Sequence, residues 1–442
     1  MASTYLTRTP SSAGNRQKWT WSAWIKLGAL GTDRNLFGAY AHSADNFKIN
    51  IADTDQVSMR FYNNTEYQLG LNRKFRDTSA WYHLVFAVDT TLASGGDRFK
   101  IYVNGVRETS FAAANDPTQN LQMTINEATA TQIGRFNTGS YFDGSMSHIN
   151  FIDGTAYDAS YFGSTDATTG EWKINTSPSV TYGTNGFWIL KDGNTITDSS
   201  PNSNNFTLGG GTLTKTEDCP SNVFATLNAL AKPGAGNLPS FGNGNTHYNK
   251  TATGAGNNSM IVATLGATTG KFYYEYKMND SNAFIAGIST LDNTYYDANG
   301  GSMNTASGVG VAYQSSGNKI INGTSTTYGN SYGSGNIVGV AFDLVNNVIY
   351  FSKDGVWQNS GDPTSGSSGT GGIGIATTGI TYSPFAQNNG YNSPSSVYYN
   401  FGNGYFGTTA VASAGTNASG NGIFEYDVPT GYTALSTKGL NL

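Results

Sequence analysis

Residues 335–362 read GNIVGVAFDLVNNVIYFSKDGVWQNSGD and carry the clearest pattern in the chain. Large apolar residues alternate with smaller or polar ones, from Val338 to Phe342 and again from Ile349 to Phe351. A polar Val-Asn-Asn turn separates the two runs, and a Lys-Asp-Gly turn follows the second. Alternation with a period of two, broken by polar turns, predicts a β-hairpin with one face in a core.

The composition favours strands over helices along the whole chain. Charged residues make up 12% of the 442 residues, which is roughly half their usual share of about 25%. The chain has 56 Gly, 27 Tyr, 23 Phe and 7 Trp, and this aromatic content argues against disorder. Its length is sufficient for two or three domains, each with a core of its own.

Charge and special residues exclude several classes of function. The net charge is −5, without a long run of either sign, so we expect binding neither to nucleic acid nor to anionic lipid. Four His and one Cys offer little for a metal or redox centre. No apolar run approaches the ~18 residues of a membrane span, and the start MASTYLTRTPSSAG lacks the apolar core of a signal peptide. We therefore expect synthesis in a cytoplasm, with no membrane insertion.

The first half of the chain predicts an antiparallel β-sandwich or jelly roll, because short alternating runs recur between turn signals. One of these turns is Asn104-Gly105, a strong hairpin signal. The expected strands lie within 18–27 (KWTWSAWIKL), 81–89 (WYHLVFAVD), 99–103 (FKIYV), 132–152 (two strands) and 198–208. A single helical turn is expected within 156–176.

The order WYHLVFAVD, KIYVNGV and YFDGSMSHINFIDG resembles the concanavalin A-like, laminin-G-type sandwich over roughly residues 16–210. Glucanases of this fold need two carboxylates that converge on the glycosidic bond, and family members carry them on one strand as E-x-D-x-x-E. None of the seven Glu of this chain begins that pattern. The nearest acidic pair, Glu425 and Asp427, lies close to the C-terminus, and we interpret Glu275 as structural. We therefore predict that the protein is not an enzyme.

The hairpin at 335–362 is similar to the central hairpin of SPRY domains, which are binding modules. Four further stretches match the SPRY pattern in order, namely GKFYYEYKM (270–278), AFIAGIS (283–289), GVGVAY (308–313) and VYYNFG (397–402). The predicted fold class is therefore all-β, with two antiparallel β-sandwiches, a concanavalin A-like jelly roll and a SPRY-like sandwich. The predicted domains are 1–215 and 246–407, with a connector at 216–245 and a tail or docking segment at 408–442.

Most aromatic residues fall on predicted strands, where a place in the core is the default. Tyr295, Tyr296, Tyr328 and Tyr332 fall on predicted loops instead. In SPRY domains such loops form the binding surface on one rim, and Tyr offers rigid contact area with one hydrogen bond. These four residues are the predicted ligand- or partner-binding residues.

Laminin-G-type sandwiches often hold Ca²⁺ at one rim, and the resemblance implies Asp53, Asp55 and Asp143 as ligands, because Ca²⁺ prefers hard oxygen ligands. The alternative is that these Asp residues cap turns, which is their commoner role. No other cofactor is expected.

The order of the two domains, with KWTWSAWIK and SHINFIDGTAYDASYFG, resembles virion structural proteins of marine bacteriophages. The resemblance implies a tail fibre, adhesin or capsid decoration that is made in the host cytoplasm and located in the virion. Its expected partners are other virion proteins, further copies of itself and, in addition, host-surface glycan. One alternative is a tail-associated carbohydrate-active enzyme, such as a polysaccharide depolymerase, and another is a soluble cellular SPRY adaptor.

Overall fold

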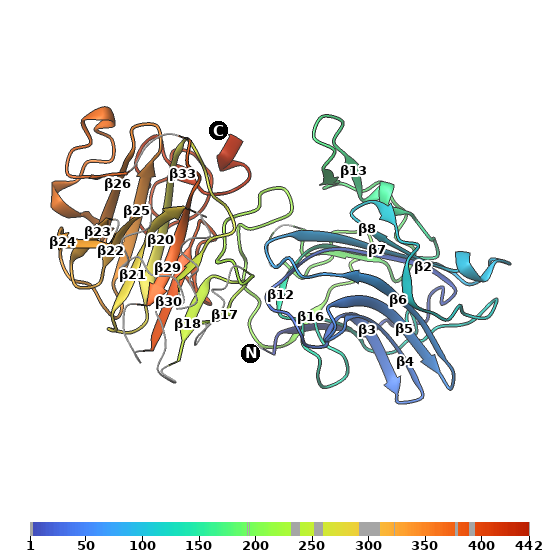
Figure 1. Ribbon diagram of the computed structural model, residues 1–442. Coiled ribbons are helices and arrows are strands. Elements are labelled where there is room, and N and C mark those ends of the chain that lie inside the picture. Colours follow the sequence, from blue (N-terminus) through green and yellow to red (C-terminus); the bar gives the residue numbers. More distant parts are fainter. Residues whose placement is uncertain are drawn as a thin grey trace. The chain divides into compact units, whose positions relative to one another are not determined.

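The chain divides into two compact units, Met1–Lys215 (unit 1) and Thr216–Leu442 (unit 2). The computed structural model describes residues 3–191, 193, 195–230, 239–251, 260–290, 310–321, 323–375, 379–388 and 394–441. Nearly all regular structure is β-strand (Figure 1), and the described residues form short 3₁₀ turns but no α-helix. In that part of the chain, no helix is long and apolar enough to cross a membrane.

Unit 1 is an antiparallel sandwich of two large sheets. The eight-stranded sheet has the order β10 (Phe111–Ala114), β6 (Glu66–Lys74), β5 (Gln56–Asn63), β4 (Asp45–Ile51), β3 (Arg34–His42), β11 (Thr131–Ile133), β1 (Tyr5–Arg8) and β16 (Thr207–Gly210). The six-stranded sheet has the order β15 (Phe187–Ile189), β12 (Gly144–Asp153), β2 (Lys18–Leu27), β7 (Trp81–Asp89), β8 (Phe99–Val103) and β9 (Val106–Arg107).

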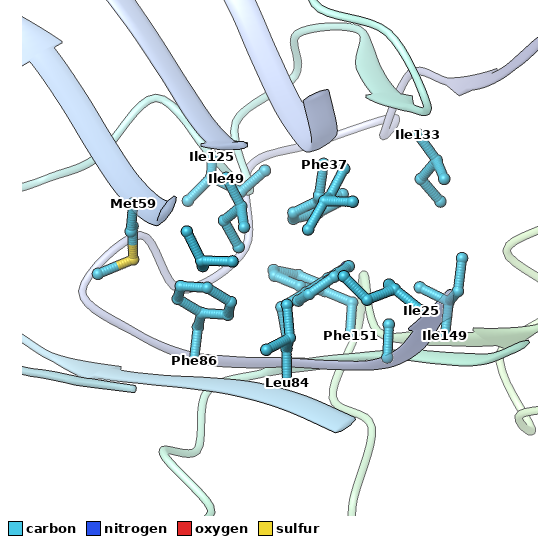
Figure 2. Packing of buried hydrophobic residues seen from close by; sticks show 14 of the residues in the cluster. Ile25, Phe37, Ile49, Met59, Leu84, Phe86, Ile125, Ile133, Ile149 and Phe151 are labelled. Atoms are coloured by element: carbon cyan, nitrogen blue, oxygen red, sulfur yellow. The ribbon is translucent and has the colours of Figure 1, made fainter. Parts of the chain in front are cut away.

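Alternation in β2 assigns its side chains to two environments. Trp19, Trp21 and Ile25 are fully buried in the core between the sheets, whereas Ser22 and Trp24 lie on the other face, as a period of two requires. Figure 2 shows the core from close by, with Phe37 of β3 pointing toward Phe86 of β7 and Phe151 of β12.

The outer face of the six-stranded sheet is covered by a second apolar cluster. Val85 and Ile152 of this sheet pack there with Phe162, Tyr182 and Trp188. The covering segment contains the 3₁₀ turn η2 (Ala159–Tyr161) and the hairpin β13 (Gly163–Thr165) and β14 (Trp172–Ile174). The predicted helical turn within 156–176 is therefore present, in the 3₁₀ form.

Unit 2 is a second antiparallel sandwich. Its nine-stranded sheet has the order β17 (Ser240–Gly242), β18 (His247–Lys250), β30 (Ser395–Asn400), β20 (Lys271–Met278), β25 (Ile337–Asp343), β26 (Val348–Lys353) and β27 (Val356–Trp357), with β28 (Ile373–Gly374) beside β26 and β33 (Thr433–Ala434) beside β20. Its six-stranded sheet has the order β19 (Met260–Val262), β29 (Tyr382–Asn388), β21 (Phe284–Thr290), β22 (Gly310–Gln314), β23 (Asn318–Ile321) and β24 (Thr324–Thr327). A separate hairpin joins β31 (Tyr405–Phe406) and β32 (Thr409–Ala410).

The predicted hairpin within 335–362 is confirmed as β25 and β26. Asp343 caps its turn, because its Oδ1 accepts hydrogen bonds from the backbone N–H groups of Val345 and Asn346, both at 2.9 Å. Asn347 takes a φ of 57°, a conformation that Asn tolerates better than most residues.

The expected connector at 216–245 and the expected tail at 408–442 both contribute to unit 2. Phe224 from the first segment and Phe424 and Tyr432 from the second are buried against Tyr273 and Tyr350. β33 also extends the nine-stranded sheet by parallel pairing with β20. Large aromatic side chains make this burial favourable, so neither segment is a simple linker or free end.

The final strand of unit 1 begins later than the sequence suggests. The prediction places it within 198–208, but β16 starts only at Thr207. The preceding residues form a hydrogen-bonded turn network around the carboxylate of Asp198. This turn network forms one wall of the hollow described next.

Candidate functional site

A shallow hollow of about 370 Å³ lies where β1 meets β16 in unit 1. Its lining residues are all polar, namely Thr7, Arg8, Thr9, Ser203, Asn204, Asn205 and Thr207. A volume near the lower end of the 300–1,000 Å³ typical of ligand pockets suits a small ligand. Hydroxyl, amide and guanidinium groups can together donate and accept hydrogen bonds, so we take this "β1 hollow" as the candidate site.

Asp198 holds the loop that forms one wall of the β1 hollow. Its Oδ1 accepts hydrogen bonds from the backbone N–H groups of Trp188 and Ser200, both at 2.8 Å. Its Oδ2 accepts from the Ser200 hydroxyl and from the Asn204 N–H, both at 2.7 Å. A carboxylate with four donors is a stable anchor, and it fixes the position of the 203–205 turn.

Arg8 supplies the only charged side chain in the lining of the β1 hollow. Its Nη2 donates a hydrogen bond to Asn204 Oδ1. Burial lowers the pKa of Arg8 below its ordinary value, and the nearby Asp198 carboxylate acts in the opposite direction. The guanidinium remains charged at neutral pH, because its ordinary pKa is above 12.

A polar strip runs from the β1 hollow across the outer face of the eight-stranded sheet. Residues directly opposite in adjacent strands point to the same face. The pairings join Thr7, Gln132, Gly38, Lys48, Arg60 and Gln68 across six strands. At ~4.8 Å between strands, this strip is about 24 Å long. It is long enough for an extended ligand.

Phe136 lies over the middle of the strip. A Cβ atom on Gly38 would come within 3.2 Å of the Phe136 ring, so the absence of a side chain there makes room for the ring. Lys48 Nζ lies 5.5 Å from the centre of the same ring, and Tyr40 meets it edge-on at 5.6 Å. Aromatic rings beside polar groups can stack on flat ligand faces.

The structure corrects the prediction that Tyr328 and Tyr332 present their rings on an exposed rim. They are only 7% and 6% exposed and belong to the core of unit 2. The Tyr332 hydroxyl donates to the Tyr313 carbonyl oxygen at 2.9 Å and accepts from the Tyr276 hydroxyl at 2.9 Å. Burial raises the pKa of Tyr328 to about 12. The loop folds inward because these rings fill the end of the sandwich.

Tyr295 and Tyr296 lie outside the described residues, so their predicted role stays a prediction.

The structure does not bring Asp53, Asp55 and Asp143 together as ligands of one ion. Asp53 is exposed in a turn. Asp55 and Asp143 both interact electrostatically with the buried guanidinium of Arg34. Arg34 therefore brings its own positive charge to the place predicted for Ca²⁺, which disfavours a second cation there. Nowhere in the described ranges do three His, Cys, Asp or Glu side chains form a group that could hold a metal ion.

Asp55 acts as a cap instead. Its Oδ1 accepts a hydrogen bond from the Gly31 N–H at 2.8 Å, and its Oδ2 pairs with Arg76 Nε at 3.2 Å. The alternative that these Asp residues stabilise turns thus describes Asp55 correctly.

His83 and Ser22 are neighbours, but their hydrogen bonds do not suit nucleophilic catalysis. Trp172 Nε1 donates to His83 Nδ1 at 3.0 Å, so the ring proton is on Nε2, which donates to the Ser22 hydroxyl at 2.9 Å. A base must accept the proton of its nucleophile, whereas here the hydroxyl accepts from the ring. Burial lowers the pKa of His83 to about 3, with His148 as a smaller cause.

Glu275 is buried and anchors the C-terminal segment. Its carboxylate accepts hydrogen bonds from the backbone N–H groups of Glu425 and Tyr426, both at 2.9 Å. It also accepts from the Tyr273 hydroxyl at 3.0 Å and from Asn400 Nδ2 at 3.2 Å. These contacts are structural, in agreement with the interpretation of Glu275 from the sequence.

Sequence reasoning missed Arg8 and the residues of the 203–205 turn. The available signal was weak, since Arg8 is one cation in the polar run TYLTRTP. Nothing in the sequence indicates that residues 7–9 and 203–207 lie side by side, because about 200 residues separate them.

Comparisons with known proteins identify both sandwiches. Residues 2–160 match the family model of the concanavalin A-like lectin/glucanases superfamily, and residues 271–371 match the SPRY domain model. The two domain types suggest a carbohydrate-binding or protein-interaction role. No curated protein sequence shows a significant match to the chain.

Three similar solved structures illustrate the range of proteins with related folds. The SPRY domain of human HERC1 is 17% identical, with 35% of this chain and 87% of that chain covered and a TM-score of 0.28. Domain 4 of AbnA, an arabinanase from Geobacillus stearothermophilus in complex with arabinotriose, is 19% identical, with 32% and 64% covered and a TM-score of 0.27. A pentraxin from Limulus polyphemus is 14% identical, with 35% and 71% covered and a TM-score of 0.25. From the two family models we conclude that the chain carries a concanavalin A-like domain followed by a SPRY domain.

Proposed function

We propose that this protein is a non-enzymatic virion structural protein of a bacteriophage, acting as a tail fibre, adhesin or capsid decoration. In this proposal, unit 1 binds host-surface glycan in the β1 hollow, and unit 2 contacts other virion proteins or further copies of the chain. The observation that carries the glycan part is the wholly polar lining of the β1 hollow, which continues into the polar strip.

The chemistry of the β1 hollow supports a sugar ligand. Sugars present many hydroxyl groups, each of which both donates and accepts hydrogen bonds, as do the hydroxyls of Thr7, Thr9 and Ser203. The Phe136 shelf on the strip adds an aromatic surface of the kind on which sugar rings stack. Unit 1 is also a member of a superfamily whose name includes lectins.

The virion part of the proposal is supported by the resemblance of KWTWSAWIK and SHINFIDGTAYDASYFG to phage structural proteins. A low content of charged residues and many turns suit a robust surface protein, whose loops can change without harm to the core. Mass spectrometry of purified phage particles tests this part, since the chain must be present in them in stoichiometric amounts. Its absence from particles would exclude the virion role.

A glycan array and host-cell binding assay with the purified protein tests the glycan part. We expect saturable binding that Thr207→Trp abolishes, because the new ring fills the β1 hollow. The matched control is Thr326→Trp, since Thr326 is likewise an exposed threonine on an edge strand, β24 of unit 2. EDTA should leave binding unchanged, because Arg34 faces the predicted Ca²⁺ ligands.

Two outcomes count against the glycan part. Binding that survives in Thr207→Trp would move the site away from the β1 hollow. Release of reducing ends from a bound polysaccharide would favour the depolymerase alternative.

A further inference from the structure

Arg8 keeps most of its hydrogen-bonding capacity for a ligand. A guanidinium has five N–H donors. Within the described part of the chain, Arg8 donates one hydrogen bond, to Asn204 Oδ1, and forms no ion pair. The side chain nevertheless lines the β1 hollow, so the remaining donors are positioned beside the space where a ligand would lie.

The nearest carboxylate does not cancel the positive charge of Arg8. Asp198 interacts with Arg8 electrostatically, but its two oxygens already accept four hydrogen bonds from Trp188, Ser200 and Asn204. Those donors stabilise the negative charge in place and orient the oxygens toward the loop. The attraction between the two groups is thus one of moderate range and lacks the direct contact of a salt bridge.

A second arginine lies beside the same strand. The guanidinium carbon of Arg135 is 3.4 Å from the centre of the Tyr5 ring, and Tyr5 precedes Thr7 by two residues on β1, hence on the same face. The buried Nε of Arg135 has no hydrogen-bond partner among the described residues. Arg135 therefore adds positive charge next to the β1 hollow.

The other cations of the polar strip are neutralised by acidic neighbours. Lys48 Nζ lies 3.6 Å from Asp33 Oδ2, and Arg60 forms a salt bridge with Glu66. The unpaired positive charge of this face thus gathers at β1, around Arg8 and Arg135.

From this arrangement we propose that the β1 hollow selects sugars that carry an anionic group, and that Arg8 is the residue that recognises this group. This inference rests on the proposed function and narrows its ligand class. The planar fork of a guanidinium matches the two oxygens of a carboxylate in a bidentate pair. The hydroxyls of Thr7, Thr9 and Ser203 are then available for the neutral hydroxyls of the same sugar.

Matched ligand pairs test the inference without any substitution. The first pair is an oligogalacturonate and the same oligomer with its carboxyl groups reduced to alcohols, and the second is sialyllactose and lactose. We expect the anionic member of at least one pair to bind at least tenfold more tightly in isothermal titration, with an affinity that falls as NaCl is raised. The pair that shows the difference tells a uronate from a sialic acid as the natural source of the carboxylate.

Substitutions at Arg8 supply the second measurement. Arg8→Gln should weaken binding of the anionic oligomer about 10- to 100-fold and leave the neutral one unchanged, because the lost contact is a charge-assisted hydrogen bond. Arg8→Lys should recover only part of this loss, since it restores the charge without the fork. The control is Arg107→Gln, which removes a cation from the exposed hairpin of β8 and β9. Thermal melting of each variant verifies that unit 1 is folded.

The outcomes separate this inference from the proposed function. Equal affinity for the charged and neutral members of both pairs, with both abolished by Thr207→Trp, would overturn the anionic preference and keep the glycan site. Binding of neither pair, nor of any glycan on the array, would overturn both proposals. Loss of anionic and neutral binding alike in folded Arg8→Gln would make Arg8 a residue that only positions the Asn204 loop.

Discussion

At the scale of single residues, two buried ionisable groups connect pH to stability. His83 is 1% exposed and stacks between Trp24 at 4.9 Å and Trp172 at 6.0 Å. Glu275 is fully buried, and its surroundings consist of hydrogen-bond donors. The first group resists protonation because a buried cation is costly, and the second has paired its charge with four partners.

His83 predicts that unit 1 loses stability in acid. The pKa of His83 is lowered to about 3 in the folded state, against about 6.5 in an unfolded chain. Its contribution is therefore fully present above pH 6.5 and is lost as the pH falls toward 3, at a rate of up to about 1 kcal/mol per pH unit. Thermal melts of the wild type and of His83→Gln between pH 7 and pH 4 measure this, with a smaller pH slope expected in the variant. The exposed His42 gives the control His42→Gln, and equal slopes in wild type and His83→Gln would contradict the assignment.

Glu275 predicts the opposite dependence in unit 2. Burial raises the pKa of Glu275 to about 7, while its hydrogen bonds act in the lowering direction. A raised folded-state pKa gives a contribution that is present below the unfolded value, about 4.3, and is lost as the pH rises through 7. The difference in melting temperature between wild type and Glu275→Gln should therefore depend on pH over this window. A difference that stays constant from pH 4 to pH 8 would show that Glu275 does not titrate there.

Glu275→Gln should also lower the stability of unit 2 at every pH, by about 2–4 kcal/mol, because its NH₂ group must face donors that need an acceptor. The matched control is Glu425→Gln, since Glu425 accepts a single hydrogen bond, from the Ala412 N–H, at an exposed position. There the amide oxygen can replace the carboxylate. Urea unfolding of both variants measures the difference.

At the scale of elements, the C-terminal segment completes unit 2. Phe424, Val428 and Tyr432 cover the outer face of the nine-stranded sheet, where Tyr273 and Val348 are buried beneath them. A sheet face with this many apolar residues needs a cover in water. The segment is therefore a structural part of the SPRY sandwich.

Removal of residues 408–442 should expose that face. We expect the truncated chain to bind a hydrophobic dye, to melt at a lower temperature in unit 2 and to aggregate, because several large side chains lose their burial at about 1.5–3 kcal/mol each. Unit 1 should keep its own transition. A truncated chain with an unchanged melting profile would show that the cover contributes little.

At the scale of the whole molecule, each unit has a core of its own. The core of unit 1 is built from residues between Leu6 and Phe206, and the main core of unit 2 from residues between Ala225 and Leu435. Fragments 1–215 and 216–442 should therefore each fold alone, with circular dichroism spectra that sum to that of the full chain. A fragment that remains unfolded would show that it depends on the other half.

The sequence by itself determined the strands and the two sandwiches. Alternation around Val340 and Phe351 depends on neighbours two residues apart, so a single stretch contains the information. The same is true of the turn that Asp343 caps. The structural role of Glu275 was also accessible, because a lone Glu within a strand of aromatic residues has to be buried or paired.

Only the tertiary structure decided which loops are surface and which residues meet. Tyr328 and Tyr332 lie in a polar loop, yet their rings fill the end of a core whose shape depends on strands far away in sequence. Asp55 and Asp143 meet at Arg34, and Arg8 meets Asn204, through pairings between distant segments. The β1 hollow forms because β1 and β16 pair at the edge of one sheet. Local patterns fix the direction of a side chain relative to its own strand, whereas its neighbours across the fold depend on how the whole chain packs.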